Sequence, residues 1–259
     1  MTTLQLNNQS VKIDAGELIS YKVGGHEFIH QKGSPGWRNA DTEMFPIIGP
    51  TNIANFRVKT PKGDAIQDQH GLLREMEYKA SDQNDTSVIF VKKYLANTKV
   101  PNSKFPNKST EKELSWPYDF QFKKAFELKE ETLEISFEIS GEQGMPFMLG
   151  YHPAFKLTGI DTIVDTGKKT ITIDEVLAVG SNALLVREVS SIVLKDKKSL
   201  KIETSGFGNF MLWTEVPNMV CIEPITFYPY AVEQKNLNTG FEELGKKAKV
   251  FKVTLTPQI

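Results

Sequence analysis

Apolar and polar residues alternate along most of this chain, which is the pattern of half-buried β-strands. The alternation is strict from Thr132 to Ile139, and the polar residues 129–131 separate it from the run before it. Similar short runs recur along the sequence, at Leu18 to Val23, Phe56 to Val58, Ser87 to Tyr94, Phe120 to Phe126, Ser199 to Glu203, Phe210 to Trp213 and Val250 to Leu255. Long amphipathic helices do not alternate with these runs. The pattern therefore predicts an all-β fold, a large antiparallel β-sandwich, rather than a doubly wound α/β fold.

Length and charge narrow the class of protein. The 259 residues are 39% hydrophobic, which is enough for one large core, and no internal repeat or linker interrupts them. We therefore expect a single domain spanning residues 1–259. The 31 basic and 32 acidic residues give a net charge of -1 without long runs of one sign. This balance argues against nucleic acid and anionic membranes as partners.

Cysteine usage and the first residues suggest a cellular location. Cys221 is the only cysteine, so no intrachain disulfide is possible, and the segment from Met1 to Asp14 lacks the basic-then-apolar profile of a signal peptide. No apolar run approaches the roughly 18 residues that cross a bilayer. We expect a cytoplasmic protein, either a monomer or a homodimer.

One long loop is expected between strands. The segment from Ala96 to Glu113 is rich in Asn, Lys, Ser and Pro and carries few apolar residues. Long loops in compact domains are often functional or mobile. The segment is either a rim over a binding face or an ordinary solvated excursion.

A zinc-protease pattern, H-E-x-x-H, occurs at His26 to His30. This pattern binds zinc only on a helix, where the two histidines share one face. Gly24-Gly25 precede it and Lys32 to Gly36 follow it closely, which leaves about two helical turns at most. The flanking residues alternate like a hairpin strand, so we expect a strand with two incidental histidines and no metal site.

Two titratable residues end apolar runs at widely separated positions. His152 follows Pro146 to Tyr151, and Pro153 biases its backbone toward an extended conformation. Glu223 follows the apolar run from Met219 to Ile222, and burying an unpaired carboxylate is costly. Each residue is either a satisfied core group or a functional group at a strand end. Partial desolvation raises the proton affinity of such a carboxylate enough for it to act as a base.

A second polar pair lies in the segment from Gln69 to Arg74. On an extended chain His70 and Arg74 would share one face, and Gly71 between them leaves room for a close ligand. Arg74 is flanked by apolar residues and needs a partner, which sugar hydroxyls or Glu223 would provide. An imidazole, a guanidinium and a carboxylate suit proton transfer on a neutral, hydroxyl-rich substrate.

Three ordered motifs carry a resemblance to a known family. They are His-Gly-x-x-Arg at His70 to Arg74, Gly-Tyr-His-Pro-x-Phe at Gly150 to Phe155 and Cys-Ile-Glu-Pro at Cys221 to Pro224. In their order and wide spacing the chain resembles the aldose 1-epimerase (galactose mutarotase) family from about Gly25 onward. The resemblance implies a galactose mutarotase-like supersandwich that interconverts the α and β anomers of a free aldohexose, with no cofactor and no metal.

The resemblance also implies roles for individual residues. Glu223 would take the proton from the C1 hydroxyl, and His152 would protonate the ring oxygen. His70 and Arg74 would orient the sugar and stabilise charge on its oxygens. Arg38 and Trp213 are further candidates for substrate binding. The chain departs from many family members after Glu-Pro, where it has Ile225 to Tyr230 in place of Trp and Gly, and the aspartate that holds substrate hydroxyls is not placed.

Three alternatives stay open on the same kind of fold. A hexose-6-phosphate 1-epimerase would need a cationic clamp, such as Arg38 with Arg74 or Lys32. A non-catalytic carbohydrate-binding protein would stack sugar on Trp37, Trp116 or Trp213. A glycoside hydrolase would normally require two acting carboxylates, and only Glu223 has a suitable setting.

Overall fold

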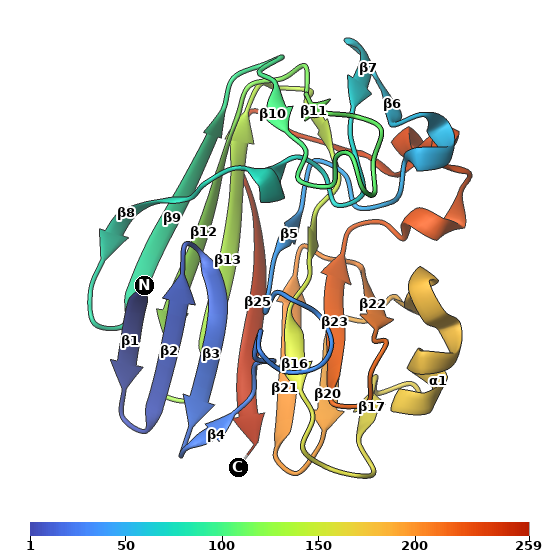
Figure 1. The fold of residues 1–259 in the computed structure, drawn as a ribbon. Coiled ribbons are helices and arrows are strands. Elements are labelled where there is room, and N and C mark those ends of the chain that lie inside the picture. The colour runs from blue at the N-terminus through green and yellow to red at the C-terminus, as the bar shows by residue number, and fades with distance from the viewer. Residues whose placement is uncertain (259) are drawn as a thin grey trace.

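Antiparallel strands in two large sheets form the body of the protein (Figure 1). The computed structural model describes residues 1–258. The first sheet has nine strands, in the order β18 (Thr170–Thr172), β17 (Ile163–Asp165), β20 (Ser191–Lys195), β21 (Ser199–Ser205), β25 (Lys249–Gln258), β13 (Leu133–Gly141), β12 (Phe120–Leu128), β9 (Ser87–Tyr94) and β8 (Lys79–Gln83).

The second sheet has six strands and carries the residues of greatest functional interest. Five of them are ordered β19 (Leu184–Arg187), β22 (Asn209–Trp213), β23 (Met219–Ile225), β15 (Gly150–Tyr151) and β5 (Glu43–Met44). The sixth, β16 (Ala154–Lys156), also pairs with β23. Consequently β23 lies at the centre of this sheet, and all seven of its residues are buried.

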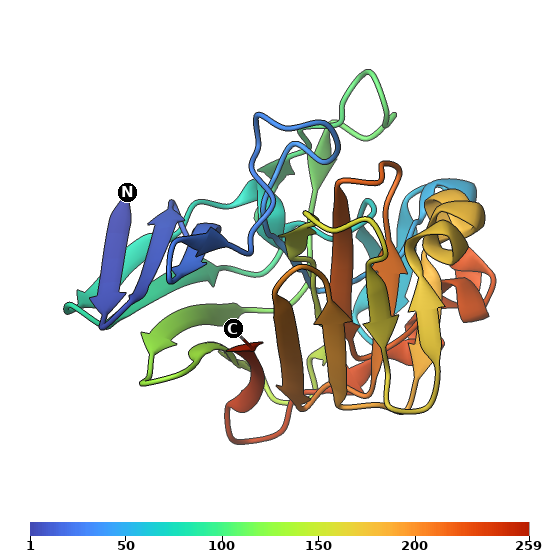
Figure 2. The same cartoon turned by 90° about the horizontal axis from the view of Figure 1, so that it is seen from below.

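Smaller sheets extend the two main ones. The N-terminal sheet contains β1 (Thr2–Leu6), β2 (Gln9–Asp14), β3 (Glu17–Val23) and β4 (His26–Glu27), and the three two-stranded pairs are β6 (Arg57–Thr60) with β7 (Gly63–Ile66), β10 (Val100–Pro101) with β11 (Glu113–Leu114), and β14 (Pro146–Phe147) with β24 (Glu242–Glu243). In the view from below, the N-terminal sheet and α1 (Ile173–Val179) lie at opposite sides of the protein (Figure 2).

Helical segments are short. Besides α1, the chain forms five 3-10 turns, η1 (Asn52–Ala54), η2 (Leu73–Glu75), η3 (Gly180–Asn182), η4 (Pro229–Ala231) and η5 (Gln234–Gly240), within residues 1–258. A helix with the length and apolar content needed to span a membrane does not occur among these residues.

The alternation in the sequence predicted the fold class correctly. Strand β9 has the predicted bounds. Strand β12 continues past the predicted end at Phe126 to Leu128. Strand β13 begins at Leu133, one residue after the predicted start, and continues past Ile139 to Gly141. Burial alternates along β12 as the pattern requires, with its inward residues covered and its outward residues partly exposed. The prediction that His26 to His30 is not a zinc helix is also confirmed, because His26–Glu27 is a strand and Glu27 accepts a hydrogen bond from Ser20.

Aromatic side chains fill the space between the two large sheets. Phe137 on β13 packs against Tyr151 on β15, with ring centroids 5.0 Å apart. Phe45, which follows β5, contacts Phe120 and Phe122 on β12 at 5.0 and 5.3 Å. Rings at these separations add roughly 0.5–1.5 kcal/mol per pair beyond the area they bury. The packing holds the strands that carry the site against a rigid second layer.

One buried position of β12 holds a charge instead of an aromatic ring. Lys124 occupies the inward phase between Phe122 and Phe126, and its side chain is 1% exposed. Its ammonium contacts Asp41 at 2.8 Å and Glu43 at 2.6 Å. Burial raises the pKa of Asp41 to about 6 against the opposing effect of Lys124. The three side chains therefore form a buried ion cluster between the sheets.

We expect Lys124→Met to destabilise the protein by about 3–5 kcal/mol, because two buried carboxylates would lose their cation. The matched control is Lys123→Met on the outward face of the same strand, where the ion pair with Glu138 is 37% exposed on both sides. That change should cost at most about 1 kcal/mol. Urea unfolding would measure both, and equal losses for the two variants would contradict a buried ion cluster.

Candidate active site

The central strand β23 presents a carboxylate to the interior. Met219, Cys221 and Glu223 alternate with residues of the opposite face, and Glu223 is 1% exposed. Among residues 1–258, only His152 has a nitrogen within ion-pair distance of this carboxylate. Burial without a compensating cation raises the pKa of Glu223 well above its usual range. Burial therefore favours the neutral form of this carboxyl group.

A gap in strand pairing brings His152 to this carboxylate. Gly150 on β15 pairs with Ile225, and Ala154 on β16 pairs with Cys221. The same register places His152 directly opposite Glu223, in the interruption that His152 and Pro153 make between the two short strands. Proline has no backbone N–H to donate to β23, which explains why the pairing stops here.

The two side chains meet in the interior of the protein. The Nε2 atom of His152 lies 3.4 Å from Oε1 of Glu223, and the side chains are 7% and 2% exposed. Burial and then the positive charge of Arg74 lower the pKa of His152 to about 3. Its Nδ1 atom is buried without a hydrogen-bond partner among the described residues. The pair thus holds one exchangeable proton, and in the ligand-free protein that proton lies on Glu223.

His70 forms another side of the same site. Its ring lies edge-on to His152, with centroids 5.4 Å apart. The Nδ1 atom lies 3.1 Å from the backbone oxygen of Ile48, and a carbonyl only accepts, so Nδ1 carries the proton. Burial, followed by the charges of Arg74 and His152, lowers the pKa of His70 well below its usual value. Its Nε2 atom is therefore a neutral acceptor, suited to a sugar hydroxyl.

Gly71 allows the His70 segment to approach the neighbouring chain. Its φ is +72°, and a Cβ atom there would lie 2.2 Å from the carbonyl oxygen of Phe45. The backbone N–H of Phe45 donates to the oxygen of His70 at 3.2 Å. Only glycine meets both requirements, so the predicted need for glycine here has a structural cause as well.

The backbone conformation at Arg74 differs from the sequence prediction. The prediction that His70 and Arg74 share a face of an extended chain is wrong, because Leu73–Glu75 forms the 3-10 turn η2. The positive charge of Arg74 nevertheless lowers the pKa of both His70 and His152. Its guanidinium forms no ion pair with the residues described. It lines a pocket of about 500 Å³ together with Asp41, Glu43, Tyr78 and Lys92 among others.

Lys92 supports the turn that carries Arg74. The side chain occupies an inward position of β9, and its Nζ atom donates to the backbone oxygen of Leu73 at 2.8 Å. Burial lowers the pKa of Lys92 to about 8, with Glu43 acting in the opposite direction. Sequence reasoning missed Lys92 and Lys124. The available signal was a lysine in the apolar phase of a strand.

Two tryptophans enclose the imidazole of His152. The indole of Trp37 stacks on it at 4.2 Å and 25°, and the ring of Trp213 lies edge-on at 6.0 Å. Both indoles line a pocket of about 490 Å³ that also includes Arg38 and Lys108. Arg38 is exposed and lies at this pocket, not in contact with the His152–Glu223 pair. The sequence suggested Trp37 only as a residue on which a sugar would stack, and its position on His152 was not predicted.

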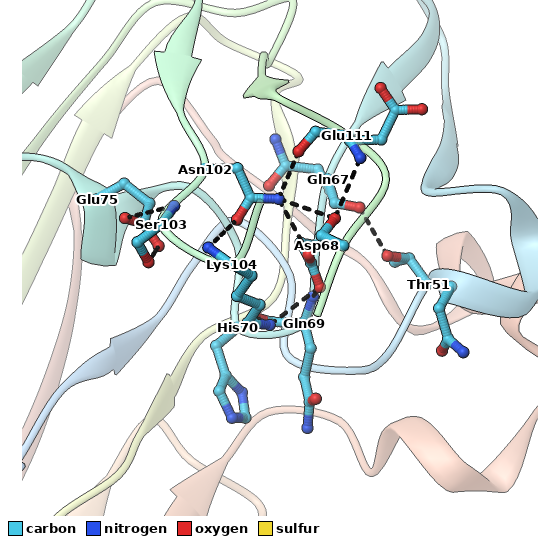
Figure 3. Close-up of polar contacts among 12 residues, drawn as sticks. Thr51, Gln67, Asp68, Gln69, His70, Glu75, Asn102, Ser103, Lys104 and Glu111 are labelled. Carbon is cyan, nitrogen blue, oxygen red and sulfur yellow. Dashed lines mark hydrogen bonds and ion pairs between the residues drawn. The ribbon is translucent and has the colours of Figure 1, made fainter. Parts of the chain in front are cut away.

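The long loop lies beside the site. The side-chain amide of Asn102 donates to Asp68 at 3.1 Å, and Lys104 binds the other oxygen of Asp68 at 3.0 Å (Figure 3). Ser103 and Lys108 line the pockets that contain Arg74 and Arg38. The segment from Ala96 to Glu113 thus borders these pockets, while most of its residues are exposed to solvent, and both interpretations stay open.

A further pocket of about 740 Å³ is lined by Gln69, the residue before His70. Its polar lining is rich in uncharged groups, which are Asn52, Gln69, Ser181, Asn182, Tyr230 and Gln234. Burial and then the charge of Glu223 raise the pKa of Tyr230 to about 12, so its phenol stays neutral, and it lies near the carboxyl group of Glu223. Glu233 and Lys235 at the rim pair with each other at 2.6 Å. The pocket offers donors and acceptors for hydroxyl groups.

Comparison with known proteins agrees with this geometry. The family described as Aldose 1-epimerase matches residues 53–208. The plasmid-encoded protein LacX of Lactococcus lactis subsp. lactis is 22% identical over 91% of both chains. A galactose mutarotase-like protein from Lactobacillus casei has a similar structure, with a TM-score of 0.79 and 18% identity over the whole of both chains. A galactose mutarotase related enzyme from Lactobacillus acidophilus gives the same TM-score and identity, over 100% of this chain and 97% of the other.

Proposed function

The chain belongs to the aldose 1-epimerase family, and on this premise we propose that it interconverts the α and β anomers of a free aldohexose. The observation that carries the proposal is the convergence of His152 and Glu223 at 3.4 Å in a buried site with His70 and Arg74 beside them. An acid and a base at this separation can act on the two oxygens attached to one anomeric carbon.

The reaction divides between the two groups. Glu223 removes the proton from the C1 hydroxyl while His152 protonates the ring oxygen, so the C1–O5 bond breaks and the open-chain aldehyde forms. Rotation about the C1–C2 bond turns the aldehyde. Ring closure returns the proton of the O5 hydroxyl to the imidazole of His152. It also returns the proton held by Glu223 to O1. The enzyme ends in its starting state, and no cofactor takes part in the balance.

The proton must first move within the pair. In the ligand-free site it lies on Glu223, because burial raises the pKa of this carboxyl and lowers that of His152 to about 3. Transfer across 3.4 Å to His152 creates an imidazolium and a carboxylate, both poorly solvated. The imidazolium is then a stronger acid than usual and the carboxylate a stronger base. Burial in this way favours proton exchange with the sugar.

The surrounding side chains suit a neutral sugar. The Nε2 atom of His70 accepts a hydroxyl hydrogen, and Arg74 stabilises negative charge that develops on a sugar oxygen. The amide-lined pocket that includes Gln69 and Tyr230 accommodates the remaining hydroxyl groups. Trp37 and Trp213 keep water from the imidazole, which strengthens the electrostatic interactions within the site.

Replacing either member of the pair should abolish most of the activity. We expect Glu223→Gln and His152→Ala each to lower the rate of anomer interconversion by about 10²- to 10⁴-fold while the circular dichroism spectrum stays unchanged. Polarimetry of freshly dissolved α-glucose and α-galactose would measure the rates. The control is Glu215→Gln, an exposed carboxylate at the pocket of Arg38, which should keep its rate.

Near-normal rates in both pair variants would refute the assignment. A wild-type protein that binds sugar in calorimetry but leaves the polarimetric rate at the buffer value would instead identify a non-catalytic carbohydrate-binding protein.

The pH profile of kcat/KM should show that the enzyme is active when the His152–Glu223 pair carries one proton. Below the pKa of His152, about 3, a second proton binds, and above the raised pKa of Glu223 the only proton is lost. Activity should therefore stay level as the pH is lowered toward about 5, and it should fall once the pH rises above the raised pKa of Glu223. Initial rates corrected for buffer catalysis would test this. An acid limb near about 6.5, the value of an ordinary histidine, would contradict the burial of His152.

One observation favours a second candidate, a hexose-6-phosphate 1-epimerase. Arg38 and Lys108 line the pocket of Trp37 and Trp213 and form no ion pair among the residues described, so they could bind a phosphate. Lys32, the other cation considered from the sequence, is already paired with Glu17. Glu215 lines the same pocket and weakens its attraction for anions.

Glucose and glucose 6-phosphate should separate the two candidates. We expect kcat/KM to be higher for glucose, and Arg38→Ala together with Lys108→Ala to leave it unchanged. Polarimetry on both substrates at equal concentration gives the ratio. A strong preference for the phosphate that disappears in the double variant would establish the second candidate instead.

A further inference from the structure

The catalytic pair has a third neighbour whose chemistry the anomerisation does not use. Cys221 lies two residues before Glu223 on the same face of β23 and is fully buried. One ligand atom from each of His152, Cys221 and Glu223 lies within 4.8 Å of the other two. Among residues 1–258, no other group of three or more His, Cys, Asp or Glu side chains brings its ligand atoms this close together.

These three side chains are a donor set for a particular kind of ion. A thiolate, an imidazole nitrogen and a carboxylate oxygen suit a borderline cation such as Zn²⁺, whereas Mg²⁺ and Ca²⁺ prefer oxygen ligands alone. Zinc bond lengths of about 2.0–2.3 Å imply ligand atoms about 3.3–3.8 Å apart in a tetrahedron. The 3.4 Å between His152 and Glu223 already lies in this range. The Cys221 sulfur lies within 4.8 Å of the other two ligand atoms, so it has to move closer to them when the ion binds.

We propose that His152, Cys221 and Glu223 form a binding site for a zinc-like divalent cation, and that the bound ion inhibits the enzyme by holding both groups of the catalytic pair. The ion is an inhibitor and not a cofactor, because the two groups that it occupies are those that must exchange protons with the sugar. The binding stands on the geometry alone, and the inhibition rests on the proposed function.

Binding of the ion is linked to proton release. Three bonds form, from the metal to the imidazole nitrogen, the sulfur and a carboxylate oxygen, and water takes the fourth position. Burial raises the pKa values of the Cys221 thiol and the Glu223 carboxyl. Binding of the ion therefore displaces the protons that these two groups carry. The apparent affinity rises with pH, since protons compete with the metal.

Cadmium tests the site without reference to activity. Titration of the wild-type protein with Cd²⁺ should produce a thiolate-to-cadmium charge-transfer band in the ultraviolet that saturates at one equivalent. Calorimetry with Zn²⁺ in two buffers of different ionisation enthalpy should show that protons are released when the ion binds. Cys221→Ser should lose the band and weaken Zn²⁺ binding more than about 100-fold, because loss of an outer partner alone costs about 10- to 100-fold.

A matched control separates this site from the histidines near the N-terminus. His26→Gln removes a partly exposed imidazole outside the site and should leave both the band and the affinity unchanged. Zn²⁺ should also inhibit anomerisation in competition with the sugar, and Cys221→Ser should resist inhibition.

The outcomes are distinct. Absence of the cadmium band, or unchanged zinc affinity in Cys221→Ser, would overturn the metal site whatever the activity. A saturating band in a protein that anomerises no sugar would support the metal site and count against the proposed function instead.

Discussion

The site depends on one interruption of backbone pairing beside the central strand β23. Strands β15 and β16 pair with it on either side of His152 and Pro153, and the register that they share places the imidazole opposite Glu223. A continuous strand would have satisfied the backbone and directed its side chains alternately to the two faces. The interruption instead fixes an imidazole at the level of a buried carboxyl, and the neighbouring hydrogen bonds between His152 and Thr42 hold the position from the other side.

Buried charges then link this strand to the second sheet. Lys124 on β12 contacts Asp41, and Asp41 also accepts a hydrogen bond from Tyr151, the residue before His152. Lys92 on β9 donates to the backbone of the turn that carries Arg74. Buried ion clusters contribute little net stability compared with apolar packing, but their directional bonds specify positions. Here Lys124 contacts Asp41 and Glu43 between the sheets, and Lys92 binds the backbone of the turn that carries Arg74.

The fold and the central pair could be predicted from the sequence because both rest on local signals. Alternation at a period of two identified the strands, and apolar runs ending in His152 and Glu223 identified the pair. The register between β15, β16 and β23 could not be predicted, since it arises from pairing across about seventy residues of chain, as the partners Ala154 and Cys221 illustrate. The turn at Arg74 was missed because the sequence there also suits an extended segment. The stacking of Trp37 on His152 was missed because a loop residue shows no periodicity that points to its partner.

The wide separation of the site residues along the chain has a consequence for how the protein acquires its activity. Trp37, His70, His152 and Glu223 come from four segments, and each is held by contacts with a different part of the two sheets. Contacts between distant segments form late in folding, since closing long loops costs entropy before it brings any gain. No subset of the strands can therefore assemble the site, and the geometry of the pair becomes complete only when β23, the last of the site strands to be synthesised, is in place. An intact site therefore indicates that folding is complete. Local opening at any of the four segments would disrupt the site while most of the nine-stranded sheet stayed intact.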